Sequence, residues 1–136
     1  MNRYLLDTDV ISFYLRGQAG VVQRVAQYLQ YHPQLELSVI SYYELRRGLV
    51  QVGATRRLQT LEIFVAQCRV WEISAEVARE ASTIAGQLGA VGSRLDDADV
   101  LIGATARTLG IGVATGNVRH FSRISELEVV NWLESP

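Results

Sequence analysis

Short apolar runs alternate along this chain with segments in which apolar positions recur every third or fourth residue. The first pattern is typical of buried strands and the second of amphipathic helices. Their alternation favours βα units stacked around a parallel sheet, so the sequence predicts an α/β protein. The predicted strands cover residues 3–6, 35–40, 69–73, 111–115 and 127–132, and the predicted helices cover 21–29, 41–50, 55–66, 77–88 and 97–109, after a first helix that starts near Thr8 and Ser12.

The chain has 136 residues, of which 49% are hydrophobic. This is enough apolar material for one sizeable core, so we expect one domain over residues 1–136. Ser41 and Glu44 have the spacing of a capping box at a helix start, and Gly53 is suited to end the same helix. No apolar stretch approaches a membrane span and no signal peptide is recognisable, so we expect a cytoplasmic protein without a membrane partner.

The net charge of −1 excludes a broad basic face for binding nucleic acid. All 13 basic residues are arginines. The pairs Arg46/Arg47 and Arg56/Arg57 suit forked contacts to phosphates, although solvated helix faces explain each pair equally well. We take Arg46 and Arg47 as candidate RNA contacts. Cys68 is the single cysteine, which excludes an internal disulfide and favours a reducing compartment.

All five aspartates fall in two clusters, Asp7 with Asp9 after the first predicted strand, and Asp96, Asp97 and Asp99 at a helix start. Carboxylates beside apolar runs cost free energy unless a cation compensates them. Ligand sites in open α/β sheets lie at the carboxyl ends of the strands, where the two clusters can meet. Oxygen ligands and only two histidines predict Mg²⁺ or Mn²⁺ rather than zinc.

Each acidic residue also has a structural explanation. Aspartates cap helices by accepting hydrogen bonds from free amides, and Glu44 fits its capping box. The joint pattern is harder to explain in this way, because a helix start needs one cap and residues 96–99 provide three carboxylates.

Four segments of the chain resemble, in order, the motifs of PIN-domain ribonucleases, specifically the VapC-type toxins of bacterial toxin–antitoxin modules. The segments are YLLDTDVIS, SYYELRRG, DADVLIGATA, and VATGNVRHFSRI followed by LEVVNW. The resemblance spans nearly the whole chain. It implies a three-layer α/β/α sandwich with a central parallel sheet of about five strands and acidic residues gathered at one end.

Carried over by position, the resemblance implies that Asp7 is the first metal ligand, Glu44 the second acid and Asp99 the third. Asp97 is then an auxiliary acid. Asp9 adds charge nearby, although we assign it chiefly to capping the helix after the first strand.

Many relatives carry a fourth carboxylate where this chain reads Thr115-Gly116-Asn117. Asn117 is neutral, so one negative charge is missing and binding of a second metal ion is left open. The implied reaction is metal-assisted hydrolysis of an RNA phosphodiester, with Asp7 and Asp99 coordinating Mg²⁺ or Mn²⁺. Glu44 accepts a proton or holds a metal-bound water, and Thr115 and Asn117 orient the site.

The resemblance further implies a homodimer that assembles with a VapB-type antitoxin. The antitoxin's tail would fill the acidic groove, inserting an arginine, and DNA would be contacted only through the antitoxin. His32 and His120 are assigned to surface or packing positions, because His120 has no evident partner. At most one of Tyr42 and Tyr43 is expected to face the groove.

Two alternative functions are kept open. LLDTDV fits the DxDx[TV] signature of haloacid-dehalogenase-like phosphatases, but those enzymes need a phosphate-binding lysine and this chain has none. A catalytically silent PIN-like module that binds RNA or protein without cutting is the other alternative, because Asn117 removes a charge from the site.

Overall fold

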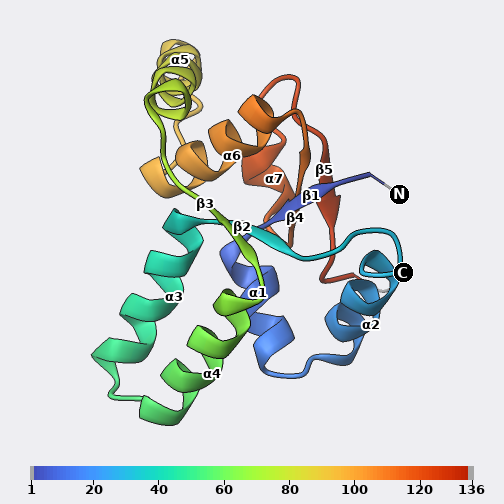
Figure 1. Ribbon diagram of the computed structural model, residues 1–136. Helices are drawn as coiled ribbons and strands as arrows, with labels where there is room; N and C mark the ends of the chain where they lie inside the picture. Colours follow the sequence, from blue (N-terminus) through green and yellow to red (C-terminus); the bar gives the residue numbers. More distant parts are fainter. Residues whose placement is uncertain (1, 135–136) are drawn as a thin grey trace.

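The computed structural model describes residues 2–134 and follows the predicted order of elements (Figure 1). This part of the chain contains β1 (Tyr4–Leu6), α1 (Thr8–Leu15), α2 (Ala19–Tyr28), β2 (Glu36–Ser38), α3 (Val39–Gln51), α4 (Thr55–Ala66), β3 (Arg69–Trp71), α5 (Ala75–Ala90), α6 (Asp97–Leu109), β4 (Gly112–Thr115), α7 (Val118–Phe121) and β5 (Val129–Asn131). All five predicted strands are present. The short helix α7 was not predicted.

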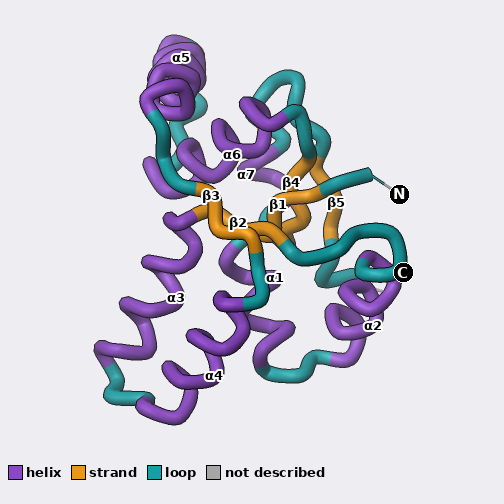
Figure 2. The backbone as a smooth tube through the Cα atoms, viewed as in Figure 1, coloured by secondary structure: helices purple, strands orange, loops and turns teal. Residues whose placement is uncertain are grey.

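The five strands run parallel through the middle of the molecule (Figure 2). Their hydrogen bonds form two ladders, one in the order β1-β4-β5 and one joining β2 to β3. Strands β1 and β2 lie side by side where the two ladders meet. In the larger ladder Leu6 is paired with Ala114, and Thr115 with Asn131. The carboxyl ends of β1 and β4 therefore lie next to each other.

Alternate residues of the strands point into two separate cores. Leu5 and Val113 pack against α5, α6 and α7, whereas Leu6 and Ala114 pack against α1 and α2. Figure 1 shows α5 and α6 on one side of the strands and α1 to α4 on the other. A strand buried on both faces has no polar side, which explains the continuous apolar runs in the sequence. The predicted α/β/α sandwich is confirmed.

Helix α3 begins earlier than predicted. It is capped by Ser38, whose hydroxyl accepts a hydrogen bond from the backbone N–H of Ile40 at 3.0 Å, so the strand predicted to reach residue 40 ends at Ser38. The predicted capping box of Ser41 and Glu44 is therefore wrong. Gly53 follows the end of α3 with a φ of 65°, as expected of a glycine that ends a helix.

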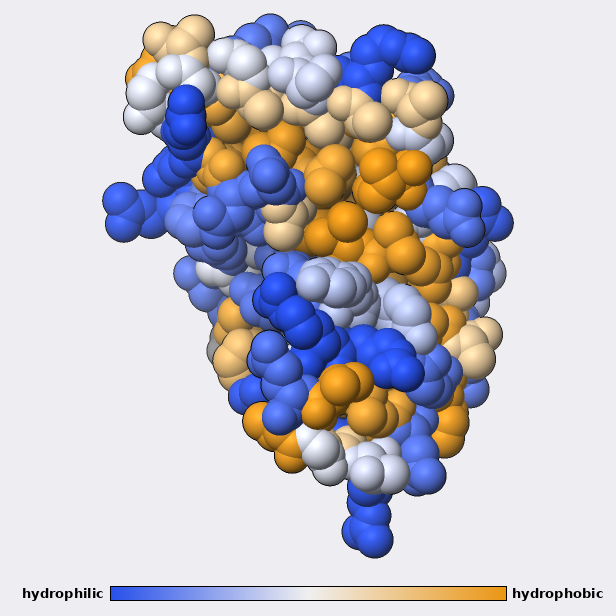
Figure 3. Space-filling model, turned by 90° about the vertical axis from the view of Figure 1, so that its left-hand side faces the viewer, coloured by the Kyte–Doolittle hydropathy of each residue, from blue (hydrophilic) through white to orange (hydrophobic). Residues whose placement is uncertain are grey.

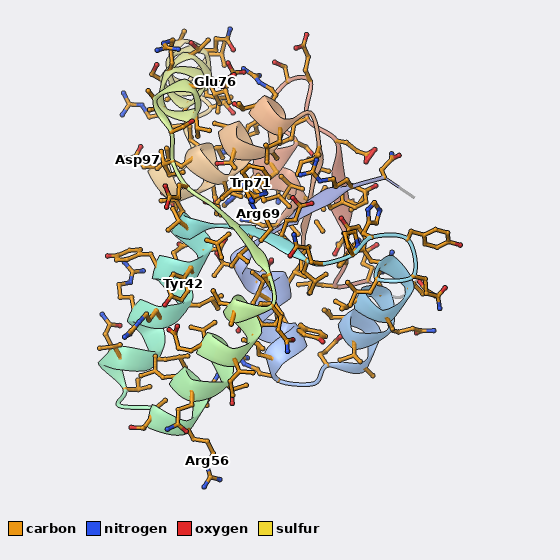
Figure 4. All side chains as sticks on the ribbon, in the orientation of Figure 1. Tyr42, Arg56, Arg69, Trp71, Glu76 and Asp97 are labelled. Atoms are coloured by element: carbon orange, nitrogen blue, oxygen red, sulfur yellow. The ribbon has the colours of Figure 1, made fainter. Side chains whose placement is uncertain are left out.

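The starts of β1 and β2 are joined by a buried acid at the edge opposite the carboxyl ends. Glu36 is 6% exposed and accepts two hydrogen bonds from the Arg3 guanidinium, both 2.6 Å long. It also accepts one from the Trp71 indole N–H at 2.9 Å. Arg69 lies over the Trp71 ring, 4.1 Å from its centroid (Figure 4). This cluster holds β1, β2 and β3 in place around one carboxylate.

The helical pair α3 and α4 extends from the strands on one side (Figure 1). Viewed from that side, the surface carries an apolar patch in its upper half above a band of hydrophilic residues (Figure 3). No helix within residues 2–134 has the length and apolar character needed to cross a membrane.

Candidate active site

Asp7 follows β1 directly and occupies the position that caps α1. Its side chain is buried, with the residue only 6% exposed. One carboxylate oxygen accepts a hydrogen bond from the Thr8 backbone N–H at 2.7 Å, and the other accepts one from the Thr115 hydroxyl at 2.8 Å. Because β4 ends beside β1, Thr115 reaches a residue far away in sequence. The two hydrogen bonds fix both oxygens of Asp7.

Asp9 ties α1 to the loop after β4. One of its oxygens accepts a hydrogen bond from the Val10 N–H at 2.7 Å, and the other accepts one from the Gly116 N–H at 3.0 Å. The prediction that Asp9 caps the first helix is wrong, because Asp7 occupies the cap position. The Asp9 carboxylate is instead held next to Asp7.

Burial and the charges of neighbouring aspartates disfavour the charged form of both Asp7 and Asp9. Burial, followed by the charge of Asp9, raises the pKa of Asp7 to about 7 despite the hydrogen bonds from Thr115 and Thr8. Burial also raises the pKa of Asp9, and the charge of Asp99 adds to both effects. Within residues 2–134 no arginine forms an ion pair with Asp7 or Asp9. The described part of the protein leaves this negative charge uncompensated.

Gly116 is the residue that lets the loop after β4 approach Asp9. A β-carbon at this position would lie 2.9 Å from an Asp9 oxygen and closer still to the Leu133 side chain. We expect Gly116→Ala to lower the free energy of unfolding by about 1–3 kcal/mol, because the Leu133 side chain and the Asp9 carboxylate must shift to admit the methyl group. Urea unfolding measures this change.

The matched control is Gly86→Ala in α5, where an added β-carbon meets nothing within 4 Å. Alanine is the better helix former, so this variant should be about 0.5–1 kcal/mol more stable than the parent. Equal stability of Gly116→Ala and the parent protein would show that the loop is not tightly packed.

Asp99 reaches the site from the first turn of α6, and Asn117 from the start of α7. The imidazole of His120 lies between them. Its Nδ1 is 2.7 Å from the Asn117 amide nitrogen and 3.2 Å from an Asp99 oxygen. The expectation that His120 has no partner is wrong. A helical turn brings His120 back to Asn117, three residues earlier, and this spacing was the signal available in the sequence.

Nδ1 of His120 cannot form hydrogen bonds with Asn117 and Asp99 at the same time. Unprotonated, Nδ1 accepts a hydrogen bond from the Asn117 amide, whereas protonated, it donates one to Asp99. His120 therefore links the orientation of the amide to that of the carboxylate.

Glu44 is positioned by α1 rather than by its own helix start. The Thr8 hydroxyl donates a hydrogen bond to Glu44 Oε1 at 2.7 Å, and it lies 3.0 Å from the hydroxyl of the buried Ser41. Both α3 residues of the predicted capping box thus meet Thr8 on α1. Thr8 and Ser41 are site residues that the sequence did not indicate.

Most of these groups line one cavity of about 680 Å³ between α1, α3, α4 and the carboxyl ends of the strands, whereas Ser41, Thr115 and His120 lie outside its wall. The acidic and amide groups in its wall are those of Asp7, Asp9, Glu44, Asp99 and Asn117. Two arginines, Arg16 and Arg57, also line it. The expected convergence of Asp7, Glu44, Asp99 and Asn117 is thus present in the structure.

Four predicted site residues do not line this cavity: Thr115, which is fully buried, and Asp97, Arg46 and Arg47. Asp97 is exposed at the start of α6 (Figure 4). Arg46 lies 3.5 Å from Glu62 in an exposed ion pair, and the Arg47 guanidinium lies over the Tyr43 ring, 5.3 Å from its centroid. Tyr42 and Tyr43 also lie outside the cavity wall.

The donor groups suit a hard cation that keeps part of its water shell. Within residues 2–134, no three Asp, Glu, His or Cys side chains converge into a complete metal-ligand group. Mg²⁺ sites commonly use one or two carboxylates and retain several waters, and this requirement is met by Asp7 and Asp99 facing the same cavity. The buried, uncompensated charge at Asp7 is the feature that such a cation would relieve.

Comparison with known proteins agrees with this arrangement. The family model of the PIN domain matches residues 4–127. Ribonuclease VapC19 of Mycobacterium tuberculosis is 29% identical, over 91% of this chain and 96% of its own length. The tRNA(fMet)-specific endonuclease VapC of Shigella flexneri is 26% identical, over 97% of this chain and 99% of its own. The chain therefore belongs to the PIN-domain family.

A solved structure has the same fold over nearly its whole length. VapBC-1 from nontypeable Haemophilus influenzae contains a chain that is 25% identical, with a TM-score of 0.82 over 96% of this chain and 98% of that one. The fold and the order of the motifs are thus those of PIN-domain proteins of the VapC type.

Proposed function

We propose that this chain is a metal-dependent endoribonuclease that acts as the toxin of a type II toxin–antitoxin system. The observation that carries the proposal is the buried Asp7 carboxylate, held by Thr8 and Thr115 with its pKa raised, beside other acids in a cavity. Perturbed acids in a cleft mark functional sites more often than structural ones. The names of the curated relatives support RNA as the substrate.

Asp7 and Asp99 are the proposed ligands of Mg²⁺ or Mn²⁺. When bound, the cation supplies Lewis-acid activation of water and neutralises charge on the scissile phosphate. Asp9 adds negative charge beside Asp7. Asp97 adds negative charge from the start of α6, with a weaker effect on the proposed cation. Asn117 supplies an uncharged amide oxygen in place of a further carboxylate.

The chain's own side chains orient the reaction. The Thr115 hydroxyl holds Asp7 in one rotamer, and the Thr8 hydroxyl occupies Glu44 Oε1. Glu44 Oε2 is then the oxygen proposed to accept the proton of the attacking water. Departure of the 3′ oxygen leaves a 5′-phosphate and a 3′-hydroxyl.

The proposed partners follow from the same family. A VapB-type antitoxin would place its tail in the cavity, with an arginine near the uncompensated carboxylates. The likeness to VapBC-1 supports such a complex. We propose a homodimer as the basic unit, higher assembly with the antitoxin, DNA contact only through the antitoxin, and action in the cytoplasm.

Removal of divalent cations is expected to abolish cleavage. Purified protein should cut structured RNA in Mn²⁺ or Mg²⁺, lose this activity in EDTA and regain it when the cation is restored. Asp99→Asn is expected to lower the rate by about 100-fold or more, because one proposed ligand loses its charge. Gel analysis of labelled RNA measures the rate.

Asp97→Asn is the matched control, because Asp97 is exposed two residues earlier on the same helix and does not line the cavity. It should stay within a few-fold of the parent. RNA binding without cleavage in any cation would support the silent module instead. The phosphatase alternative has no support, because the family match is to a different fold.

A further inference from the structure

Two arginines share the cavity with the carboxylates. Arg16 follows the last turn of α1, and Arg57 lies in the first turn of α4. Two different helices therefore bring positive charge into the wall of the cavity. The same wall carries the carboxylates of Asp7, Asp9, Glu44 and Asp99.

Arg57 has no structural task in the described part of the protein. Three other arginines form ion pairs with glutamates: Arg3 with Glu36, Arg107 with Glu80, and Arg46 with Glu62. Arg57 forms no ion pair, side-chain hydrogen bond or ring contact within residues 2–134. Its charge is thus available to a ligand in the cavity.

Arg16 is engaged only weakly. Its guanidinium lies over the Phe13 ring, 5.7 Å from the centroid, and Phe13 is itself 37% exposed. Such a contact orients the guanidinium but leaves its N–H groups free to donate. Ser12 lines the same cavity and adds a neutral hydroxyl donor for a phosphate oxygen, whereas the Thr60 hydroxyl already donates to the Arg56 carbonyl at 3.2 Å.

A polyanion needs local cations to approach this site, because the chain has a net charge of −1 and four carboxylates line the cavity. We propose that Arg57, assisted by Arg16, binds a backbone phosphate adjacent to the scissile bond and so positions the RNA strand across the carboxylates. The inference rests on the proposed ribonuclease function. It replaces Arg46 and Arg47, which lie outside the cavity, with Arg57 and Arg16 as the phosphate-binding residues.

An RNA strand fits this arrangement better than an acidic peptide does. Its phosphates recur at regular spacing, so one phosphate can lie at the proposed cation while a neighbouring phosphate binds arginine. An acidic peptide would satisfy Arg57 but would place further carboxylates against Asp7 and Asp9.

The chain offers a matched pair for the test. Arg56 is the neighbour of Arg57, is also exposed, and points away from the body of the protein (Figure 4). Binding of a short fluorescein-labelled single-stranded RNA is measured by anisotropy at increasing KCl with Mg²⁺ held constant. The Asp7→Asn background prevents cleavage during the measurement.

Arg57→Ala is expected to weaken RNA binding by about fivefold to tenfold and to reduce the slope of log affinity against log salt by about 0.7, the value for one lost phosphate contact to a single strand. Arg56→Ala should change neither quantity. Arg57→Lys should restore the slope but only part of the affinity, because an ammonium lacks the forked geometry. A purely structural role for Arg57 would alter the melting temperature and leave the salt slope unchanged.

The outcomes separate the two levels of the proposal. If Arg57→Ala and Arg56→Ala bind RNA with equal affinity and slope, the assignment of Arg57 is overturned while the ribonuclease function stands. If the Asp7→Asn protein binds no RNA and the parent protein cuts none, both the assignment of Arg57 and the proposed ribonuclease function are overturned. If Arg57→Ala weakens binding of an acidic peptide but not of RNA, Arg57 belongs to a protein interface and the present assignment is wrong.

Discussion

Asp7→Asn is expected to abolish RNA cleavage and, in the metal-free protein, to raise the free energy of unfolding above about pH 7. Loss of a charged ligand at the centre of the site should lower the rate by about 1,000-fold or more. The stability gain arises because asparagine carries no charge to bury, while its Oδ1 can still accept from the Thr8 N–H and its Nδ2 can donate to the Thr115 hydroxyl oxygen. Asp7 thus destabilises the metal-free protein, and its proposed role as a metal ligand accounts for its presence.

The sign of the effect follows from the two pKa values. Asp7 has a pKa of about 7 in the folded protein against an ordinary value of 3.8, so the folded state holds a proton that the unfolded state has released between these values. Stability therefore falls as the pH rises through this window. The difference corresponds to at most about 4 kcal/mol, because one pKa unit equals about 1.4 kcal/mol.

Urea unfolding in EDTA at about pH 5 and about pH 8 tests this expectation. Asp7→Asn should be more stable than the parent at the higher pH, with a smaller advantage at the lower one. Asp97→Asn, which removes an exposed carboxylate, should show no such dependence. A less stable Asp7→Asn protein at the higher pH would mean that the Asp7 carboxylate is compensated in the folded chain.

Glu36→Ala is expected to cause the largest loss of stability among charge-removing variants, about 2–3 kcal/mol. The change removes a carboxylate that accepts hydrogen bonds from both Arg3 and Trp71, and it leaves the indole N–H without its acceptor. Burial raises the pKa of Glu36, but the hydrogen bonds from Arg3 and Trp71 outweigh this, so its pKa is lowered. The stability it provides is therefore present above its ordinary value of 4.5 and is lost as the pH falls through the lowered pKa.

Glu62→Ala is the control for this experiment. Its ion pair with Arg46 is 3.5 Å long and both side chains are 47% exposed, so the loss should stay below about 1 kcal/mol. Thermal or urea unfolding at neutral pH measures both variants. Similar losses for Glu36→Ala and Glu62→Ala would contradict a stabilising role for the buried cluster. RNA cleavage measured well below the melting temperature should be retained in both, because Glu36 and Glu62 lie outside the cavity wall.

Local signals predicted the strands well and the helix starts less well. The apolar runs around Leu5 and Val113 predicted their strands because residues buried on both faces of a sheet leave a clear local pattern. The pair Ser41 and Glu44 had the spacing of a helix cap, yet Ser38 caps α3. Both serines were chemically able to cap, and only the end of β2 decided between them.

The site shows the same division between local and long-range information. The two aspartate clusters could be selected because acids beside apolar runs need an explanation, and the resemblance to PIN-domain ribonucleases assigned Asp7, Glu44 and Asp99 among the acids. The contact of His120 with Asn117 had a local signal in their spacing, but its contact with Asp99 depends on the packing of α7 on α6. Arg57 had no such signal, because it enters the cavity wall through the packing of α4 against α3.

The sequence by itself determined the α/β alternation and the residues able to carry acid chemistry, because burial periodicity and residue type are local properties. The tertiary structure alone decided which groups meet. Parallel pairing of β1 with β4 sets Thr115 against Asp7, and the packing of α1 on α3 sets Thr8 against Glu44. Hydrogen bonds and charge interactions act only over a few ångströms, so these contacts exist only once the strands and helices have come together.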